Sequence, residues 1–199
     1  DVLLLLHADH EQNCSTSTVR MVGSSGANLF GSVAAGVSAL WGPLHGGANV
    51  AVVEMLETII NEKLSVKDFV KDVKDKKNGI KLMGFGHRVY KNGDHRAGIL
   101  RDWGLKYAAD ENAAAKKWFD LGDEVQAIML RDKNIHPNVD FPCGMTYFAM
   151  GIPVPQYTPI FVASRVTGWC AHIMEQHANN RIIRPLANYV GPELRNWCD

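Results

Sequence analysis

The sequence has no closely spaced pair of cysteines. Its four cysteines are widely spread and form no Cys-x-x-Cys motif, which excludes a zinc ribbon and a disulfide framework: Cys14, Cys143, Cys170 and Cys198. This distribution favours a reducing compartment, and we expect a cytoplasmic protein. Cys198, next to the last residue, is expected to be exposed.

Long hydrophobic segments are also missing. The chain opens with the apolar run 2–6 and then turns polar, and this run is too short for a signal-peptide core or a membrane span. Arg20, Asn28 and several serines argue against a membrane helix in the small-residue stretch 15–44. Because no initiator methionine is present, we expect the chain to begin inside an element of a longer protein.

The sequence has no net charge, since 21 lysines and arginines balance 21 aspartates and glutamates. No global field therefore favours nucleic acid or an anionic membrane, and any anion site must be local. Apolar residues make up 46% and charged residues 21%, as in ordinary soluble proteins. A chain of 199 residues can bury a good core, as one domain or two small ones.

No segment shows sustained period-two alternation, so we predict an all-α fold. Spacings of three and four between apolar residues, with glycine and proline as terminators, predict the helices: one or two within 15–44, then 48–62, 65–77, 96–108, 112–131, 143–150 and 158–178. The proline-bracketed run 135–142 is expected to interrupt the helical pattern. An irregular tail is expected from Arg184-Pro185 onward.

Four polar clusters interrupt the apolar patterns, and the first is His7-Ala8-Asp9-His10-Glu11-Gln12-Asn13. Two histidines three residues apart can share a helix face, and His, Asp and Glu are zinc ligands. However, the order His-x-x-His-Glu matches neither His-Glu-x-x-His nor His-x-x-Glu-His. We therefore expect a hydrogen-bonded polar cluster without a metal, and a metallohydrolase remains the alternative.

The second cluster, 40–49, and the fourth cluster, 137–141, each offer one candidate catalytic group. His45, at the start of the helix expected over 48–62, is predicted to be neutral and able to donate a hydrogen bond to a carbonyl oxygen. Asp140, between Val139 and Phe141, is predicted to be partly desolvated, which raises its pKa and strengthens it as a base. The alternatives are a histidine in a capping turn and an N-cap aspartate.

The third cluster is the stretch 83–96, where His87 follows Gly-Phe-Gly and Arg88, Lys91 and Arg96 come soon after. Glycines permit close approach of the backbone, the histidine can exchange a proton, and the basic residues suit an anionic ligand. The alternative is a tight turn with a solvated basic face. Four arginines are candidates for binding carboxylates bidentately: Arg96, Arg165, Arg181 and Arg184.

Taken together, these stretches resemble the citrate synthase family, and its bacterial hexameric type above all. The matching words are His7-Ala8-Asp9-His10-Glu11, Trp41-Gly42-Pro43-Leu44-His45-Gly46-Gly47-Ala48-Asn49, Gly84-Phe85-Gly86-His87-Arg88-Val89-Tyr90, Pro137-Asn138-Val139-Asp140-Phe141, and Arg165 with Arg184-Pro185. Family chains are about twice this long, so the resemblance implies the C-terminal half. It implies a two-domain helical fold with an incomplete large domain, 1–47 and 145–199, and a small domain, 48–144.

The resemblance implies condensation of acetyl-CoA with oxaloacetate to give citrate and CoA, with acetyl-CoA as co-substrate and no permanently bound cofactor. By this resemblance, His45 polarises the thioester carbonyl, Asp140 removes a methyl proton, and His87 protonates the oxaloacetate carbonyl. It assigns oxaloacetate binding to His10, Arg96 and Arg165, and a contact with the neighbouring subunit's site to Arg184. It assigns part of the CoA site to Leu82, Met83, Gly84, Gly86, Lys91 and Asn138.

The resemblance also implies a homo-oligomer with the dimer as its unit, up to a hexamer. The small-residue helices of 15–44 resemble the family's dimer interface. Two alternatives stay open besides the metallohydrolase: a 2-methylcitrate synthase acting on propionyl-CoA, and a catalytically inactive helical fragment that serves as an oligomerisation module.

Overall fold

A computed structural model describes residues 1–75 and 81–197, and these residues are helical with no β-strand. The α-helices are Val2–His7 (α1), Cys14–Ser24 (α2), Leu29–Trp41 (α3), Ala48–Asn61 (α4), Val66–Lys74 (α5), His95–Glu111 (α6), Ala113–Lys133 (α7), Asp140–Ala149 (α8) and Tyr157–Ala178 (α9). A short 3₁₀ turn, Val154–Gln156 (η2), precedes α9. The all-α prediction is confirmed. Cys198 lies outside the described residues, as do positions 76–77 of the helix expected over 65–77.

Side-chain caps explain where four of the helices begin. The side-chain oxygens of Asn13, Asn28, Ser65 and Asp94 each accept a hydrogen bond from a backbone N–H in the first turn of α2, α3, α5 and α6. Such a cap satisfies a donor that has no partner within the helix. At the other end of α7, Asn134 adopts the left-handed conformation, which terminates the helix.

The prediction of a helix over 143–150 was wrong at its start. Helix α8 begins at Asp140, so Pro142 lies inside its first turn. A proline is tolerated there because the first backbone N–H groups of a helix have no intrahelical acceptor. The earlier start places Asp140 in the first turn of a helix.

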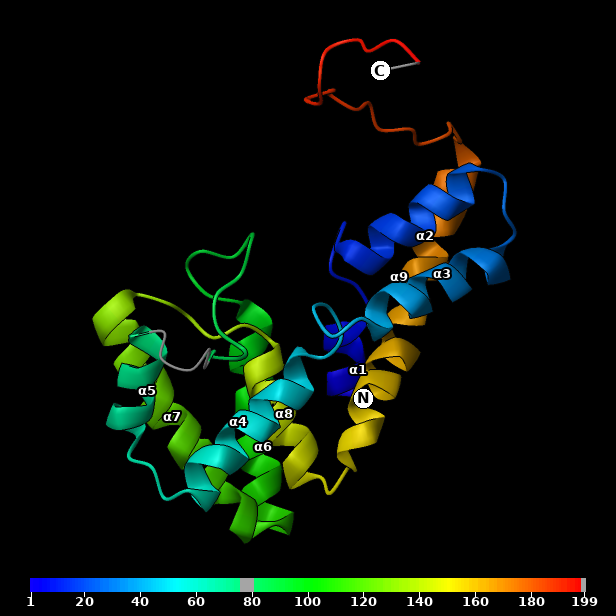
Figure 1. Cartoon of the computed structure of the whole chain (residues 1–199). Coiled ribbons are helices and arrows are strands. Elements are labelled where there is room, and N and C mark those ends of the chain that lie inside the picture. Colours follow the sequence, from blue (N-terminus) through cyan, green and yellow to red (C-terminus); the bar gives the residue numbers. More distant parts are fainter. Residues whose placement is uncertain (76–80, 198–199) are drawn as a thin grey trace.

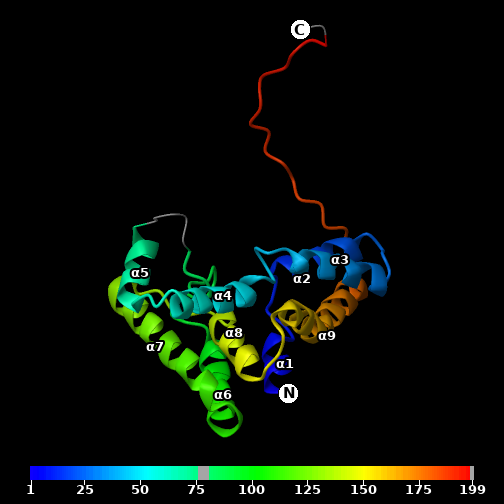
Figure 2. The ribbon, with the colours of Figure 1, turned by 60° about the horizontal axis from the view of Figure 1, so that its bottom comes forward.

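Two hydrophobic clusters form the core. The larger one joins α4, α5, α6, α7 and α8, and the smaller one joins α2, α3 and α9 around Val19, Leu40 and Trp169. Helix α1 lies between the two groups and packs against both α9 and α6 (Figures 1 and 2). The segments that carry the polar clusters therefore meet where the two groups of helices adjoin.

Residues 179–197 form no regular structure. Asn180 and Ile183 still donate hydrogen bonds to Ser24 at the end of α2, and the residues after them extend away from both helical groups (Figures 1 and 2). The predicted irregular tail is confirmed, although it begins at Asn179, directly after α9, rather than at Arg184. Across the two described ranges, none of the helices combines the length and the apolar character needed to cross a membrane.

Two glycines of α6 provide a test of the packing between α6 and α8. A Cβ on buried Gly104 would lie 2.3 Å from Thr146 Oγ1 and 2.7 Å from Phe119, whereas a Cβ on exposed Gly98 would have no neighbour within 4 Å. We expect Gly104→Ala to lower the free energy of unfolding by about 1–2 kcal/mol, because overpacking outweighs the higher helix propensity of alanine. The matched control Gly98→Ala should raise it by up to about 1 kcal/mol. Urea unfolding measures both, and equal stability of the two variants would contradict close packing at Gly104.

Candidate active site

One small polar cavity, with a volume of about 150 Å³, collects most of the residues that the sequence singled out. It is smaller than the roughly 300–1,000 Å³ of pockets for drug-sized ligands, and so suits a small acid. The side chains that line it come from segments far apart in the chain: His10, Asn13, Cys14, His45, His87, Arg96, Asn138, Val139, Asp140, Phe161 and Arg165.

Backbone pairing between two loops sets the relative positions of His87 and Asp140. Gly86 N donates to His136 O at 2.8 Å, and Asn138 N donates to Gly84 O at 2.9 Å. The Asn138 side chain extends this pairing, because its Nδ2 donates to Gly86 O at 2.9 Å and its Oδ1 accepts from Asp140 N at 3.0 Å. One asparagine therefore connects the loop before His87 to the start of α8.

The Gly42–Gly47 turn presents His45, and a backbone amide fixes which nitrogen of its ring carries the proton. Ser15 N donates to His45 Nε2 at 3.2 Å, and Ser15 Oγ lies 2.9 Å from the same nitrogen. Because a backbone N–H can only donate, Nε2 keeps its lone pair and the proton of a neutral ring lies on Nδ1. Burial and the nearby Arg165 lower the pKa of His45 to about 4. The sequence predicted a neutral ring from the helix dipole, whereas burial is the main cause in the structure. At neutral pH His45 is an uncharged hydrogen-bond donor.

Backbone amides also hold the His87 ring, through Nδ1 rather than through Nε2 as in His45. Val89 N and Tyr90 N both donate to His87 Nδ1 at 3.1 Å, which leaves the ring proton on Nε2. The ring stacks on Tyr90 with 4.7 Å between centroids. Burial lowers its pKa, and the positive charges of Arg96 and Lys91 act in the same direction against Asp94. His87 is therefore also a neutral donor.

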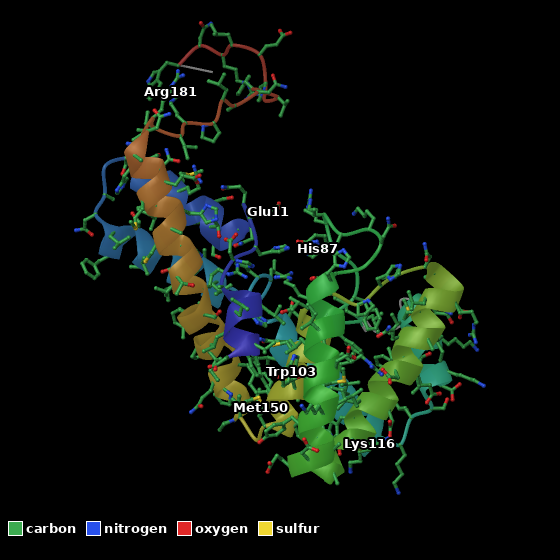
Figure 3. The ribbon with its side chains drawn as sticks, turned by 180° about the vertical axis from the view of Figure 1, so that it is seen from behind. Glu11, His87, Trp103, Lys116, Met150 and Arg181 are labelled. Carbon is green, nitrogen blue, oxygen red and sulfur yellow. The ribbon has the colours of Figure 1, made fainter. Side chains whose placement is uncertain are left out.

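His10 stands opposite His87 on the loop between α1 and α2. Their rings meet edge to face with 4.9 Å between centroids, and Tyr90 lies 5.3 Å from the His10 ring centroid. Figure 3 shows the neighbouring Glu11 and His87 on loops that face each other. Burial, followed by the charge of Arg96, lowers the pKa of His10 to about 4.

Asp140 supplies a carboxyl group whose affinity for a proton is raised. Its burial raises its pKa to about 6, and the charges of Arg96 and Arg165 only partly offset this. The group is therefore mostly ionised at neutral pH, yet it holds a proton more strongly than an ordinary aspartate. This confirms the direction predicted from the apolar neighbours Val139 and Phe141.

Two arginines give the cavity its positive charge. Arg96 Nε and Nη2 donate to Asp94 at 3.0 and 2.8 Å, so its Nη1 group stays available. Arg165 is only 2% exposed, and its Nε donates to His7 O at 2.7 Å. The Arg165 guanidinium also lies 4.8 Å from the Phe161 ring centroid. Burial and the neighbouring Arg96 lower the pKa of Arg165 to about 10, so it remains charged at neutral pH.

The other predicted site residues lie around the cavity rather than in its lining. Leu82 and Met83 pack against the larger hydrophobic cluster. A Cβ on Gly84 would lie 2.7 Å from Val52, so this glycine serves close packing. Gly86 is exposed, with a positive φ of 75°.

Lys91 is exposed, and its Nζ donates to His87 O at 3.0 Å. Arg184 is exposed in the tail and does not line the cavity. Figure 3 shows the nearby Arg181 where the tail leaves α9, away from His87.

Sequence reasoning missed several residues that shape the cavity. Cys14 and Phe161 line it, and Ser15 fixes the His45 ring. Asp94 is buried and orients Arg96. It lies within the third polar cluster, 83–96, but no role was predicted for it. No periodicity distinguishes these residues from core positions, although an acidic residue two positions before an arginine in a basic cluster was an available signal for Asp94.

His7 and His10 do not converge. His7 is fully buried, its Nδ1 lies 2.9 Å from Leu3 O, and its ring packs edge-on against Phe161 at 4.6 Å. Within residues 1–75 and 81–197, no group of three His, Cys, Asp or Glu side chains is placed to hold a metal ion.

The arrangement brings together two neutral imidazole donors, one carboxylate base and two guanidinium groups. A base with a raised pKa can remove a weakly acidic proton, and a preorganised donor can stabilise the negative charge that then develops on an oxygen. The guanidinium groups can hold the carboxylates of a small acid. Such a set suits proton abstraction beside a carbonyl group, followed by attack on a second carbonyl group.

Comparison with known proteins agrees with this chemistry. A family profile described as "Citrate synthase, C-terminal domain" matches residues 1–186. The chain is 48% identical over 204 residues to citrate synthase 1 of Mycobacterium tuberculosis (strain CDC 1551 / Oshkosh), covering 99% of this chain and 47% of that protein. It is 49% identical over 203 residues to citrate synthase of Corynebacterium glutamicum, covering 98% and 46%.

A solved structure shows the same fold. It is the ternary complex of citrate synthase from Thermoplasma acidophilum with carboxymethyl coenzyme A and oxaloacetate, which superposes with a TM-score of 0.86 at 34% identity. The match covers 98% of this chain and 52% of that one. The chain thus spans about half the length of the relatives it matches. It belongs to the citrate synthase family, whose C-terminal domain it represents.

Proposed function

We propose that this chain carries the reacting groups of a citrate synthase, which condenses acetyl-CoA with oxaloacetate to give citrate and CoA. The observation that supports this most strongly is that His45, His87 and Asp140 line one cavity together with Arg96 and Arg165. The relatives' names also support it, and none of them favours the 2-methylcitrate alternative. The chain covers only about half of each of these relatives. That the chain catalyses the reaction by itself is therefore part of what we propose.

Oxaloacetate binds between the two arginines in this proposal. Arg165 and the Nη1 group of Arg96 hold its two carboxylates, and His10 supplies a further polar contact. Two guanidinium groups compensate the double negative charge of the substrate, and charge-assisted hydrogen bonds fix its orientation. The ketone oxygen is thereby presented to Nε2 of His87.

The thioester is activated by a base and a donor acting together. Asp140 takes a proton from the methyl group of acetyl-CoA while Nδ1–H of His45 donates to the thioester carbonyl oxygen. A methyl group beside a thioester is a very weak acid, so the carboxylate alone would be too slow. A preorganised donor such as His45 can contribute about 3–4 kcal/mol by stabilising the enolate oxygen as charge develops.

Carbon–carbon bond formation then requires the two substrates to lie side by side. The enolate carbon attacks the ketone carbon of oxaloacetate, and the ketone oxygen takes the proton from Nε2 of His87. The product is citryl-CoA, and water cleaves its thioester to give citrate and the CoA thiol. Because His87 is neutral, giving up its Nε2 proton leaves an imidazolate, whose negative charge the nearby Arg96 and Lys91 stabilise. The proton that Asp140 took from the methyl group balances this loss, and its return to His87 by way of water restores both groups for the next turnover.

CoA approaches along the loop before His87. In this proposal CoA passes the backbone of 82–86 with its exposed Gly86, and then the Asn138 amide, which lines the cavity. The exposed Lys91 is the cation that suits the phosphates of CoA. Closure of the small domain, 48–144, on the large-domain part, 1–47 and 145–199, would keep water out until the carbon–carbon bond has formed.

Self-association completes the proposal. Helix α3 exposes large apolar side chains, with Phe30 83% and Trp41 79% exposed, and Leu44 beyond it is 99% exposed. Exposed apolar surface of this kind supports a homo-oligomer with a dimer as its unit. In such an assembly Arg184 reaches the neighbouring subunit's site from the extended tail. The proposed location of the protein is the cytoplasm.

Oxaloacetate binding provides a direct test of the arginine roles. We expect calorimetry to detect binding by the wild-type chain, and Arg165→Gln and Arg96→Gln each to weaken it at least about tenfold, since a hydrogen bond to a charged group contributes ~1.5–3 kcal/mol. Arg101→Gln is the matched control, because Arg101 lies on the same helix as Arg96 but pairs with Asp123 outside the cavity. Equal affinity in all three variants would refute the proposed pocket.

Asp140→Asn tests the base. Thiol release from acetyl-CoA in the presence of oxaloacetate should fall by about 10²–10⁴-fold, because general-base catalysis is lost, while oxaloacetate affinity changes little. Because only the ionised carboxylate accepts the proton, the wild-type rate should fall as the pH drops below about 6. The control Asp123→Asn should keep wild-type activity. If the wild type released no thiol, the inactive-fragment alternative would be favoured. If Asp140→Asn released thiol at the wild-type rate, another group would have to be the base.

A further inference from the structure

Helix α9 holds the segment that leads to His10 through direct side-chain contacts. Ser164 Oγ donates to Leu4 O, and Arg165 Nε donates to His7 O at 2.7 Å. Both acceptors are backbone carbonyl groups at the end of α1, where intrahelical partners run out. The course of the chain after α1 is thus set by α9.

The next two turns of α9 continue this contact. A Cβ on Gly168 would lie 2.1 Å from Ala8 O, so the backbone of the loop lies directly against the helix at this position. His172 follows one turn later, and its Nε2 lies 2.9 Å from Asp9 Oδ1. Because residues four apart share a helix face, Ser164, Gly168 and His172 form one stripe under the loop.

A second contact fixes the proton of His172. Arg20 Nη1 lies 3.2 Å from His172 Nδ1, and a guanidinium group can only donate, so Nδ1 accepts and the proton of a neutral ring lies on Nε2. Arg20 itself is held by Glu175 Oε2 at 2.7 Å and by Gln176 Oε1 at 3.0 Å. His172, whose side chain is 18% exposed, is therefore oriented to donate to Asp9.

Asp9 transmits this contact to the residues on either side of His10. Its Oδ1 meets His172, while its Oδ2 accepts from Glu11 N at 3.3 Å. Glu11 has a φ of 50°, a left-handed conformation that is costly for a residue with a side chain. The turn needs outside support, and Asp9 provides it on both sides of His10.

We propose that His172 is a positioning residue that aims the His10 ring at the cavity by holding Asp9. The proposal rests on the proposed function for its consequence, because His10 is taken to contact oxaloacetate. The geometric part is independent of the ligand. If Asp9 is released, the turn at Glu11 relaxes, and the His10 ring loses its edge-to-face contacts with His87 and Tyr90.

Nuclear magnetic resonance tests the geometric part without any ligand. We expect nuclear Overhauser contacts between the His10 and Tyr90 rings in the wild type, their loss in His172→Ala, and their return in His172→Gln, whose side-chain N–H can donate to Asp9. Asp9→Ala should reproduce the loss without altering α9, which keeps the test valid if His172→Ala unfolds. His177→Ala is the matched control, because this histidine of the same helix contacts Gly23 O away from the cavity. Contacts that persist in both His172→Ala and Asp9→Ala would overturn the proposal.

Calorimetry with oxaloacetate tests the functional part on the same proteins. His172→Ala and Asp9→Ala should each weaken binding about tenfold, and the double variant should be no weaker than either single one, since both act through one contact. Binding that is unchanged in the single variants would overturn the consequence for His10. A wild-type chain that shows the ring contacts but binds no oxaloacetate would refute the proposed function and leave the positioning geometry supported.

Discussion

The candidate site depends on backbone N–H groups that occupy one nitrogen of each of two imidazole rings. Ser15 N uses Nε2 of His45, and Val89 N and Tyr90 N share Nδ1 of His87. An amide can only donate, so the proton of each neutral ring lies on the opposite nitrogen, while burial lowers the pKa of both rings and keeps them neutral. Local folding therefore sets which nitrogen of each ring donates, and both rings stay uncharged donors at neutral pH.

Neutral rings allow the remaining charges of the cavity to be assigned. Were His45 and His87 protonated, they would add two positive charges to those of Arg96 and Arg165, and Asp140 would be held more strongly in its ionised form. Neutral rings leave burial as the dominant influence, and the pKa of Asp140 rises to about 6. A base and its partner donors thus coexist in a volume of about 150 Å³.

Much of this could be predicted from the sequence, and the exceptions have physical reasons. Apolar spacing located the helices from α2 to α9 but not the short α1, whose single apolar run carries no periodic signal. The start of α8 was misplaced because a proline in a first turn looks like a helix breaker. His45, His87 and Asp140 stood out because polar residues interrupt apolar patterns. Ser15 and His172 did not, because their roles arise from contacts with residues far away in the sequence. Ser15 and His45 are 30 residues apart, and His172 and Asp9 are 163 residues apart, so periodicity cannot reveal either contact.

The central claim is that both rings are neutral donors with opposite tautomers, and ¹⁵N resonances of the histidine side chains test it most directly. At pH 7 the protonated nitrogen should be Nδ1 in His45 and Nε2 in His87. His45 should gain a second proton only near pH 4, and His87 only below the ordinary histidine pKa of about 6.5. An imidazolium signal from either ring at pH 7, or the reverse tautomer in either, would contradict the account.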